Sequence, residues 1–559
     1  MIRLFGSAQA VLVASSAVSS RTALRATGPD ATDVAVVGSG INALVCGALL
    51  ARAGVGVSVL EQADVLGGAI RSAALTRDGF NHDVFSAWHP LFVASGAYTT
   101  LAADLARYGL RYETADAVTA AVTGGGSVVM TRSREETIAE LEGHAAGEGA
   151  RFVADRAAFD AVAPSVMSLL SDEVLSTATL RSALSVLRHM GPRGARSLAG
   201  SLAESARAWL ESTYRAPATA ALFAPWVLHT GLGPDAAGSG IMGRAIVALL
   251  EGVGLPVPAG GGARLVEALR GVIEEHGGTC RTGADVDRVL VAGGRATGVR
   301  LTTGAVVGAR RAVVCSVTPP ALYDRLLADA PVPEWARRAA RRFRFGRAGM
   351  QVHYALGAPP RWHADERLRD VPVVHLSSGL AGVSKAVGEA ERGLLPEEAT
   401  IVCGQPCAVD PTRAPDGSWI LWIQLQELPA RPLGDAGGSI DVGDGTWTES
   451  LRERYADRIH ARLSEQIDGF DTLVQARVAL SPADIARANP NLVGGDIYAG
   501  ACDLDQNLMF RPRAELGGHR TPVRGLYQIG ASTHPGPGLG GVSGTLVARR
   551  ILGRSRRAR

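Results

Sequence analysis

Lysine is almost missing from this sequence of 559 residues. Lys385 is the only one, so arginine supplies nearly all of the positive charge, a bias that we attribute to a GC-rich genome rather than to function. The formal net charge of +3 is small for a chain of this length. The charge balance therefore gives no argument for a nucleic-acid partner.

Cysteine is also scarce, and its six positions are scattered, which is not the pattern of a disulfide framework: Cys46, Cys280, Cys315, Cys403, Cys407 and Cys502. Cys403 and Cys407 have a spacing that is open to a metal or redox pair, but we interpret them as small apolar residues of a strand and the turn after it. Because no group of histidines and cysteines has the spacing of a zinc site, we predict no metal.

The sequence lacks an apolar run that is long enough to span a bilayer. Residues 1–31 are rich in serine and alanine, and we interpret them as a leader, a disordered extension or a start assigned too far upstream, with a secretory signal as the alternative. Residues 549–559 carry six arginines. We expect 554–559 to be a solvated basic tail in a cytoplasmic protein, with attraction to a membrane surface as the alternative.

What the chain does contain is a large apolar fraction, 47%, and a length that suggests two to four domains. Its clearest pattern lies in residues 33–70. An apolar run at 34–37 has the composition of a buried parallel strand, a glycine turn follows, and 41–53 is typical of a helix. A second apolar run, 57–60, ends on Glu61. This order predicts a βαβ unit with a glycine turn at its first strand–helix junction.

The residues of this junction suit a nucleotide. Gly38 permits a sharp turn, Gly40 lets the backbone approach a pyrophosphate, and the free N–H groups at the helix start face the negative charge. Glu61 stands where a carboxylate accepts hydrogen bonds from a ribose 2′-OH. Ala43 replaces the third glycine of the GxGxxG pattern, at a position that needs only a small residue. A glycine-rich turn without a ligand is the alternative.

The segment just beyond Glu61 indicates which dinucleotide is bound. The run Gly67-Gly68-Ala69-Ile70-Arg71 resembles a segment of FAD enzymes in the amine oxidase and phytoene desaturase superfamily, in which the glycines and the arginine lie along the flavin side of the cofactor. A NAD dehydrogenase has no reason for that segment, and the sequence contains no second glycine fingerprint for NAD(P)H. We therefore predict FAD and leave the electron acceptor open.

The middle of the chain changes character at about residue 99. Apolar spacing predicts helices at 101–108, 133–144, 152–170, 180–189 and 195–210, and the apolar stretch 220–228 either lines a pocket or belongs to a core. No catalytic motif appears there. His82 and His89, which precede this block, and His534 near the end are weak acid–base candidates, with loop histidines held by hydrogen bonds as the alternative.

From residue 257 the pattern again suits a nucleotide-binding domain, with a helix at 263–276 and short strands at 285–291, 296–302 and 311–316. A further block follows from 319, with strands at 343–356, 401–405 and 419–426 and a helix at 449–467. The strand at 419–426, WILWIQLQ, alternates in part and is typical of a strand that faces a cavity.

Near the C-terminus a strand at 526–529 runs into a glycine-rich turn and then a helix at 542–552. Backbone N–H groups at the start of such a helix can meet the pyrimidine edge of a flavin. That edge gains negative charge on reduction, so these donors favour hydride acceptance.

These patches together resemble the phytoene desaturase-like FAD oxidoreductases, which include bacterial carotenoid desaturases, carotenoid isomerases and relatives of unknown substrate. The resemblance covers residues 32–553. The GASTHPG turn at 530–536 is its most specific motif, and the DPTRAP and GGDI loops at 410–415 and 494–497 support it. It implies an α/β fold: a Rossmann-like FAD-binding domain of glutathione-reductase type (32–98, 251–318 and 519–553) with an inserted α+β substrate domain (99–250 and 319–518).

The resemblance also implies a set of FAD-binding residues, of which Val286 contacts the adenine end through its backbone. The full set that we predict is Gly38, Ser39, Gly40, Ile41, Asn42, Ala43, Glu61, Gln62, Gly67, Gly68, Arg71, Val286, Gly530, Ala531, Gly540, Gly541 and Val542.

We predict that the protein dehydrogenates a small apolar substrate, isoprenoid or lipid-like, by hydride transfer to flavin N5, with orientation and electrostatics supplied by the protein. One alternative is an amine or amino-acid oxidase, for which Lys385 is the only lysine available to hold a water near N5. The others are a redox-neutral isomerase that needs reduced FAD and a FAD-holding scaffold without turnover. The sequence leaves the substrate and the oligomeric state open.

Overall fold

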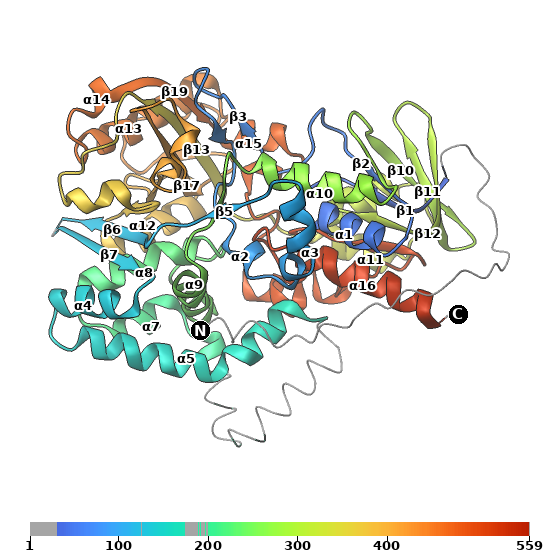
Figure 1. Ribbon diagram of the computed structural model, residues 1–559, viewed down its shortest axis with the longest axis horizontal. Helices are drawn as coiled ribbons and strands as arrows, with labels where there is room; N and C mark the ends of the chain where they lie inside the picture. Colours follow the sequence, from blue (N-terminus) through green and yellow to red (C-terminus); the bar gives the residue numbers. More distant parts are fainter. Residues whose placement is uncertain are drawn as a thin grey trace.

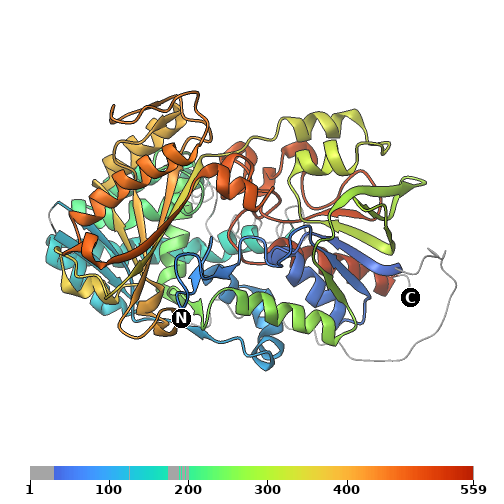
Figure 2. The same cartoon turned by 90° about the horizontal axis from the view of Figure 1, so that it is seen from above.

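The computed structural model describes residues 31–124, 126–173 and 200–557, together with positions 188, 191 and 196. The predicted leader, apart from Ala31, and most of the predicted helix at 180–189 lie outside the described residues. Two seven-stranded sheets lie side by side, each covered by helices (Figures 1 and 2). The predicted α/β class is confirmed. No helix in the described part of the chain is both long and apolar enough to cross a membrane.

The first sheet combines five parallel strands with an antiparallel hairpin that pairs with β12. Its strands are β1 (Ala31–Val37), β2 (Val57–Leu60), β9 (Thr279–Arg281), β10 (Val286–Ala292), β11 (Arg295–Leu301), β12 (Val306–Cys315) and β20 (Leu526–Gln528). β1 is central and buried on both faces, because Val34 and Val36 enter one core while Ala35 and Val37 enter another.

Helices cover both faces of the first sheet. One face packs against α1 (Ile41–Arg52), α3 (Gly96–Arg107), α10 (Ala263–Glu275) and α16 (Val542–Arg557) (Figure 1). α1 and α16 approach closely because Gly544 has no side chain: a Cβ there would lie 1.9 Å from the carbonyl oxygen of Asn42. The other face packs against a short helix, Ala321–Leu326, and α11 (Glu334–Arg341).

The second sheet is mixed, in the spatial order β19, β13, β17, β16, β14, β6, β7. The bounds are β6 (Ala117–Thr123), β7 (Gly126–Thr131), β13 (Ala348–Leu356), β14 (Val373–Leu376), β16 (Ile401–Gly404), β17 (Trp419–Leu428) and β19 (Val474–Leu480). α13 (Glu449–Ser464) packs on one face. The opposite face meets α8 (Pro217–Leu228), α9 (Ser239–Val253) and α12 (Gly379–Glu391). Further helices in the described part of the chain are α4 (Arg134–His144), α5 (Glu148–Ser171) and α7 (Ala206–Thr213).

The packing differs from the sequence prediction in three places. The segment 117–131, for which we predicted no element between the helices at 101–108 and 133–144, forms the hairpin of β6 and β7 at the edge of the second sheet. α3 was assigned to the substrate domain, yet its Leu101 lies in the same core as Val34 of the first sheet. Leu322 likewise packs on the first sheet although it follows residue 319. By their packing, α3 and Leu322 therefore belong with the first sheet. The division of the chain into a FAD-binding domain and a substrate domain stays a prediction.

A buried ion pair joins the two parts of the molecule. Arg413, from the loop before β17, is fully buried and pairs with Asp83 of β4 (His82–Asp83), a short strand that pairs with β3 (Ser72–Ala73). Asp83 Oδ1 also accepts from Ser72 Oγ at 2.7 Å and from the backbone N–H of Gly262, at the start of α10, at 2.8 Å. From the same loop, Asp410 Oδ2 accepts from Gly260 N at 2.7 Å. The DPTRAP loop thus fastens the second sheet to the first.

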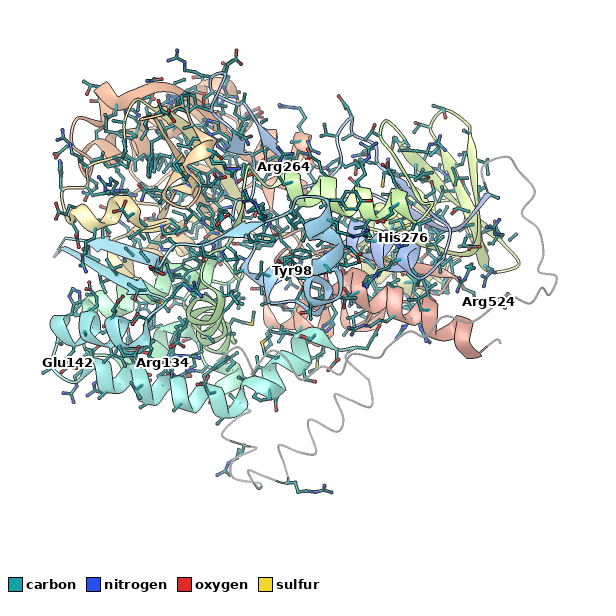
Figure 3. The ribbon with its side chains drawn as sticks, in the orientation of Figure 1. Tyr98, Arg134, Glu142, Arg264, His276 and Arg524 are labelled. Carbon is teal, nitrogen blue, oxygen red and sulfur yellow. The ribbon has the colours of Figure 1, made fainter. Side chains whose placement is uncertain are left out.

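Replacing Arg413 by Met should lower the free energy of unfolding by about 3–5 kcal/mol, because Asp83 and Asp410 would stay buried without their cation. Denaturant unfolding followed by tryptophan fluorescence measures the loss. Arg413→Met combined with Asp83→Asn should cost less than the sum of the single changes. The matched control is Arg264→Ala on α10 (Figure 3), where the ion pair with Glu267 is exposed and the change should stay within about 0.5 kcal/mol. Equal losses for the two arginines would contradict the assignment.

Candidate functional site

The turn between β1 and α1 is shaped for close contact with a ligand backbone. Gly38 has φ +91°, a left-handed conformation that favours glycine. Gly40, in contrast, has an ordinary extended backbone, and a Cβ built on it would meet no atom within 4 Å. In an α-helix the first N–H groups have no partner within the helix, so those of Ile41 and Asn42 are available to a ligand at this turn.

Glu61 holds this turn in place. Its Oε2 accepts hydrogen bonds from the backbone N–H of Ser39 at 2.9 Å and from Ser39 Oγ at 2.6 Å. Its Oε1 accepts from Ala63 N at 3.0 Å, and Ser39 Oγ in turn accepts from Gly67 N at 3.0 Å. The carboxylate that sequence reasoning assigned to a ribose therefore also ties the two glycine turns together.

The second glycine turn lies directly against the first. Gly67 and Gly68 have φ +113° and +61°, and a Cβ on Gly68 would lie 3.1 Å from the Cα of Gly40. Arg71 follows, and its Nε is buried without a hydrogen-bond partner among the described residues. Burial lowers the pKa of the Arg71 guanidinium, while the charges of Glu61 and Asp64 oppose that shift. An anionic ligand group would satisfy this side chain.

The C-terminal turn meets the same region, because α16, which follows it, packs on the same face of the first sheet as α1. Gly530 has φ +108°, and its N–H donates to Ser543 Oγ at 2.9 Å, which links the turn to α16. Gly541 sits against α1, where a Cβ would lie 2.9 Å from Val45 Cγ2. The carbonyl of Ala531 accepts from Arg511 Nε at 2.7 Å. The turn is therefore held by contacts with three separate segments.

Arg511 is fully buried and is surrounded by backbone carbonyl groups. Besides Ala531, its guanidinium donates to the carbonyl oxygens of Ala501 at 2.9 Å and Tyr498 at 3.0 Å. Asp496, the acid of the GGDI motif, accepts the backbone N–H groups of Gly346, Tyr498 and Gly500 at 2.7–2.8 Å. Together Asp496 and Arg511 fix the loop 498–500 beside the C-terminal turn.

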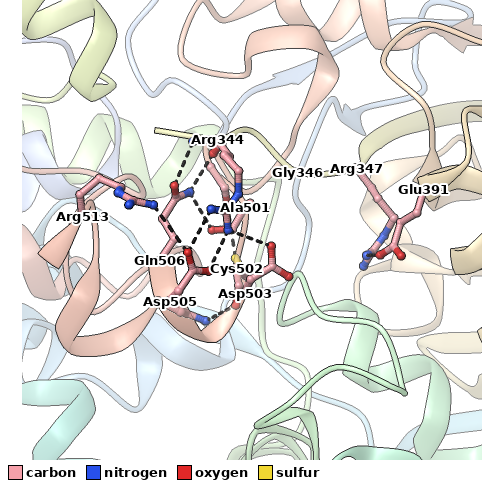
Figure 4. Close-up of polar contacts among 12 residues, drawn as sticks. Arg344, Gly346, Arg347, Glu391, Ala501, Cys502, Asp503, Asp505, Gln506 and Arg513 are labelled. Atoms are coloured by element: carbon pink, nitrogen blue, oxygen red, sulfur yellow. Dashed lines mark hydrogen bonds and ion pairs between the residues drawn. The ribbon is translucent and has the colours of Figure 1, made fainter. Parts of the chain in front are cut away.

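The loop around Arg511 is anchored in turn to the segment before β13 (Figure 4). Gln506 Oε1 accepts from Arg344 N at 2.9 Å, and Gln506 Nε2 donates to the carbonyl oxygens of Arg344 at 2.8 Å and Ala501 at 3.2 Å. The Arg344 guanidinium pairs with Asp505 at 2.8 Å. This anchoring holds Arg511 where it reaches the C-terminal turn.

A cavity of about 640 Å³ connects these turns with the second sheet. Most of the predicted FAD-binding residues line it: Gly38, Ser39, Gly40, Ile41, Asn42, Glu61, Gln62, Gly67, Gly68, Arg71, Val286, Gly530 and Ala531. Ala43, Gly540, Gly541 and Val542 do not. Ala43 lies on the buried face of α1 in the core of the first sheet, and Gly541 packs on α1. The contacts of all these residues with a cofactor stay predictions.

Of the three histidine candidates, only His89 lines the cavity. Its Nδ1 shares a hydrogen bond with the Tyr112 hydroxyl at 3.1 Å, and its Nε2 has no partner among the described residues. His82 is buried beside Thr76 and His353, away from the cavity. His534 is held between the carbonyl oxygens of Leu508 and Asp172. The structure therefore places His82 and His534 outside the cavity lining, each held by hydrogen bonds. The sequence could not separate them from His89, because the residues around a loop histidine do not report whether it faces a cavity.

Sequence reasoning missed much of the far wall of the cavity. Trp88, Trp226, His229, Val373, Val402 and Tyr498 line it, together with Gln351, Trp422, Gln424 and Gln426. The alternation in β17 was one available signal, since Trp422, Gln424 and Gln426 fall on one face of that strand. The apolar stretch 220–228, left open between pocket and core, is both: Trp226 lines the cavity while Phe223 is buried in the core.

The residues present fit a dinucleotide such as FAD. The open space at Gly40 admits a pyrophosphate, the first turn of α1 supplies N–H donors, and Glu61 and Arg71 offer a carboxylate and a partly unsatisfied guanidinium on either side.

Replacing Glu61 by Ala should weaken FAD binding by about tenfold or more, because charge-assisted hydrogen bonds are lost and the Ser39 turn is released. Flavin absorbance after dialysis, compared with protein concentration, measures the retained cofactor. Asp64→Ala is the control, since Asp64 is an exposed acid of the same loop that does not line the cavity. Full flavin occupancy in the Glu61 variant would remove Glu61 from this role.

Alanine at Gly38 and at Gly40 should have opposite effects. Gly38→Ala should destabilise the apoprotein by about 1–2 kcal/mol because of its positive φ. Gly40→Ala should leave apoprotein stability unchanged or raise it by up to about 1 kcal/mol, yet reduce FAD retention, since the new methyl group occupies the open space. Denaturant unfolding and flavin content separate the two. Normal FAD retention by Gly40→Ala would contradict a pyrophosphate at this turn.

Known proteins resemble the chain along most of its length. It is 26% identical to pyridine nucleotide-disulfide oxidoreductase domain-containing protein 2 of Rattus norvegicus, over 93% of each chain. It is 23% identical to a limonene dehydrogenase polypeptide of Castellaniella defragrans, over 90% of this chain and 91% of that one. A zeta-carotene-forming phytoene desaturase of Myxococcus xanthus is 29% identical over about half of each chain, 54% and 53%.

Solved structures share the fold. Putrescine oxidase bound to putrescine superposes with a TM-score of 0.58 at 17% identity, covering 94% of this chain and 99% of the other. The family described as flavin containing amine oxidoreductase matches residues 44–388, which is more than half of the sequence. The family match agrees with the two glycine turns, whose residues fit FAD. The protein is therefore an oxidoreductase of the flavin containing amine oxidoreductase family, with FAD as its cofactor.

Proposed function

We propose that the protein is a FAD-dependent dehydrogenase of an apolar, isoprenoid or lipid-like substrate. The observation that carries the proposal is the continuity of the cavity. It runs from the glycine turns of the first sheet to a wall formed by the second sheet and by α8 and α9. A substrate on that wall would share one enclosed space with the reactive end of the cofactor.

The chemistry of the cavity changes along its length. The charged side chains among its described lining residues are Glu61, Arg71, Asp285 and Arg325, all of which belong to the first-sheet part. The far wall carries large apolar side chains instead, including Trp226, Leu249, Leu250, Leu255, Val373, Val402 and Trp422. Such a wall stabilises a molecule with a large apolar surface through the hydrophobic effect.

The imidazoles of the cavity are held neutral. Burial, with the nearby positive charge of Arg413, lowers the pKa of His89 to about 3. Burial lowers the pKa of His229 to about 4. At neutral pH both rings therefore present polar but uncharged surface to a substrate.

The position of Lys385 weighs against an amine oxidase that depends on a lysine beside the flavin. Lys385 lies on α12, is more than half exposed, and pairs with Glu397 at 2.6 Å. It does not line the cavity. Because it is the only lysine of the sequence, this chain has no other to offer.

Two of the relatives described above also support an apolar substrate. One is named for limonene and the other for phytoene, and both names denote isoprenoid hydrocarbons. Bound FAD supplies the two-electron acceptor for a substrate C–H bond. The contribution of this chain is to hold the substrate on the apolar wall, to exclude water with the tryptophans, and to fix the C-terminal turn through Arg511.

The proposal predicts a yellow protein whose flavin is bleached anaerobically by an apolar isoprenoid or fatty acyl compound. Visible spectra recorded against a panel of carotenoids, monoterpenes, fatty acyl compounds and amines measure this. Trp226→Ala should slow bleaching by the active compound by about tenfold or more while FAD stays bound, because the variant loses apolar contact area on the far wall. Bleaching and oxygen consumption with amines alone would favour the amine oxidase instead. Conversion of a carotenoid only by the reduced enzyme, without net oxidation, would favour an isomerase, and a flavin inert to every donor and acceptor would favour a scaffold.

A further inference from the structure

Three glutamines lie on the cavity-facing side of the second sheet. Gln351 of β13 pairs in register with Gln424 of β17, and Gln426 lies two residues further along the same face. All three line the cavity. A wall that served a pure hydrocarbon would gain nothing from carboxamides at these positions, because burying a polar group without a partner costs free energy.

Two of the glutamines carry an oxygen without a hydrogen-bond partner among the described residues. Gln351 donates from Nε2 to the carbonyl oxygen of Phe85 at 2.9 Å, which leaves its Oε1 unpaired. Gln426 donates from Nε2 to Gln424 Oε1 at 3.2 Å, which leaves its own Oε1 unpaired. Gln351 is 1% exposed and Gln426 is 3% exposed. Buried acceptors of this kind are normally satisfied, so a donor group is expected in the cavity.

The surroundings of the glutamines are polar without being charged. Across the sheet, Gln424 is in register with Val402, and Val402 with His375. His375 Nε2 lies 3.3 Å from His229 Nε2, and burial lowers the pKa of both rings, so this pair is neutral at neutral pH. The Tyr498 hydroxyl is already committed to the carbonyl oxygen of Leu228 at 2.5 Å. No carboxylate among the described lining residues belongs to this wall.

We infer that the substrate carries a hydroxyl group that hydrogen-bonds to Gln426 and Gln424, so that its class is a lipid-like alcohol rather than a plain hydrocarbon. This inference rests on the proposed function. A hydroxyl is both a donor and an acceptor, and it matches a carboxamide pair that offers an unpaired oxygen and amide N–H groups. An ammonium group has donors only and would be buried without a counter-charge.

The test measures binding to the holoenzyme by equilibrium dialysis, independently of any reaction. Perillyl alcohol and limonene share a carbon skeleton and differ by one hydroxyl, and 1-dodecanol and dodecane form a second matched pair. The wild-type protein should bind the alcohol of at least one pair about tenfold more tightly than its hydrocarbon, since a hydrogen bond to an otherwise unpaired buried acceptor is gained. In Gln426→Leu the preference should fall to within about twofold, and Gln424→Leu should reduce it in part.

The control variant is Val402→Ala, which should weaken both members of a pair equally because it removes only apolar contact. The flavin spectrum of each variant reports whether the protein is folded and loaded. Equal binding of alcohol and hydrocarbon by the wild type, no binding of either alcohol, or an unchanged preference in both glutamine variants would overturn the inference. Flavin bleaching is followed in parallel: an alcohol preference that depends on Gln426, with no bleaching by any compound, would keep this site and refute the proposed dehydrogenation.

Discussion

The buried ion pair between Asp83 and Arg413 is the interaction on which the relation between the two sheets depends. Arg413 is supplied by a loop of the second sheet, whereas Asp83 and the N–H group of Gly262 belong to the first-sheet part. Because the cavity takes one wall from each part, the network sets how the nucleotide end and the apolar end face each other. Asp410 adds a second carboxylate from the same loop, so the fastening does not depend on a single hydrogen bond.

Arg511 fastens another part of the cavity wall, at Tyr498, Ala499 and Ala531, by different chemistry. It is as deeply buried as Arg413, but its partners are backbone carbonyl groups of the loop 498–501 and of Ala531 rather than carboxylates. The carbonyl oxygens accept the guanidinium N–H groups directly, without a carboxylate as hydrogen-bond partner. Asp496 completes the arrangement by accepting the N–H groups of the same loop. The two arginines thus stabilise two loops that carry recognisable motifs, DPTRAP and GGDI.

The nucleotide end could be predicted from sequence because its signals are local. Gly38, Gly40 and Glu61 lie within one βαβ unit, and the strand and helix patterns around them are short and unambiguous. The role of Glu61 in holding Ser39 could not be predicted, because it depends on how two turns approach each other. The same limit applies to α3, whose apolar face shows that it is buried but not against which sheet.

The far wall was harder to predict because it is assembled from distant segments. β6 pairs with β14, which lies far along the chain, and nothing in 117–123 announces that partner. α8 is apolar around its whole circumference, so periodicity could not single out Trp226 as a cavity residue. β17 is the exception, since the alternation of side chains along a strand is enough to place Trp422, Gln424 and Gln426 on a common face.

The pairing of strands in the first sheet has a consequence for the order in which the protein folds. β20 pairs with β12, and Gly530 and α16 close the site against β1 and α1, so the first and last parts of the chain are neighbours. A ribosome makes β1, the glycine turns and Glu61 long before β20 and α16, which complete their surroundings. The site can therefore close around a cofactor only after α16 has been made, and until then the apolar faces of β1 and α1 that α16 and β20 will cover must be kept from aggregating.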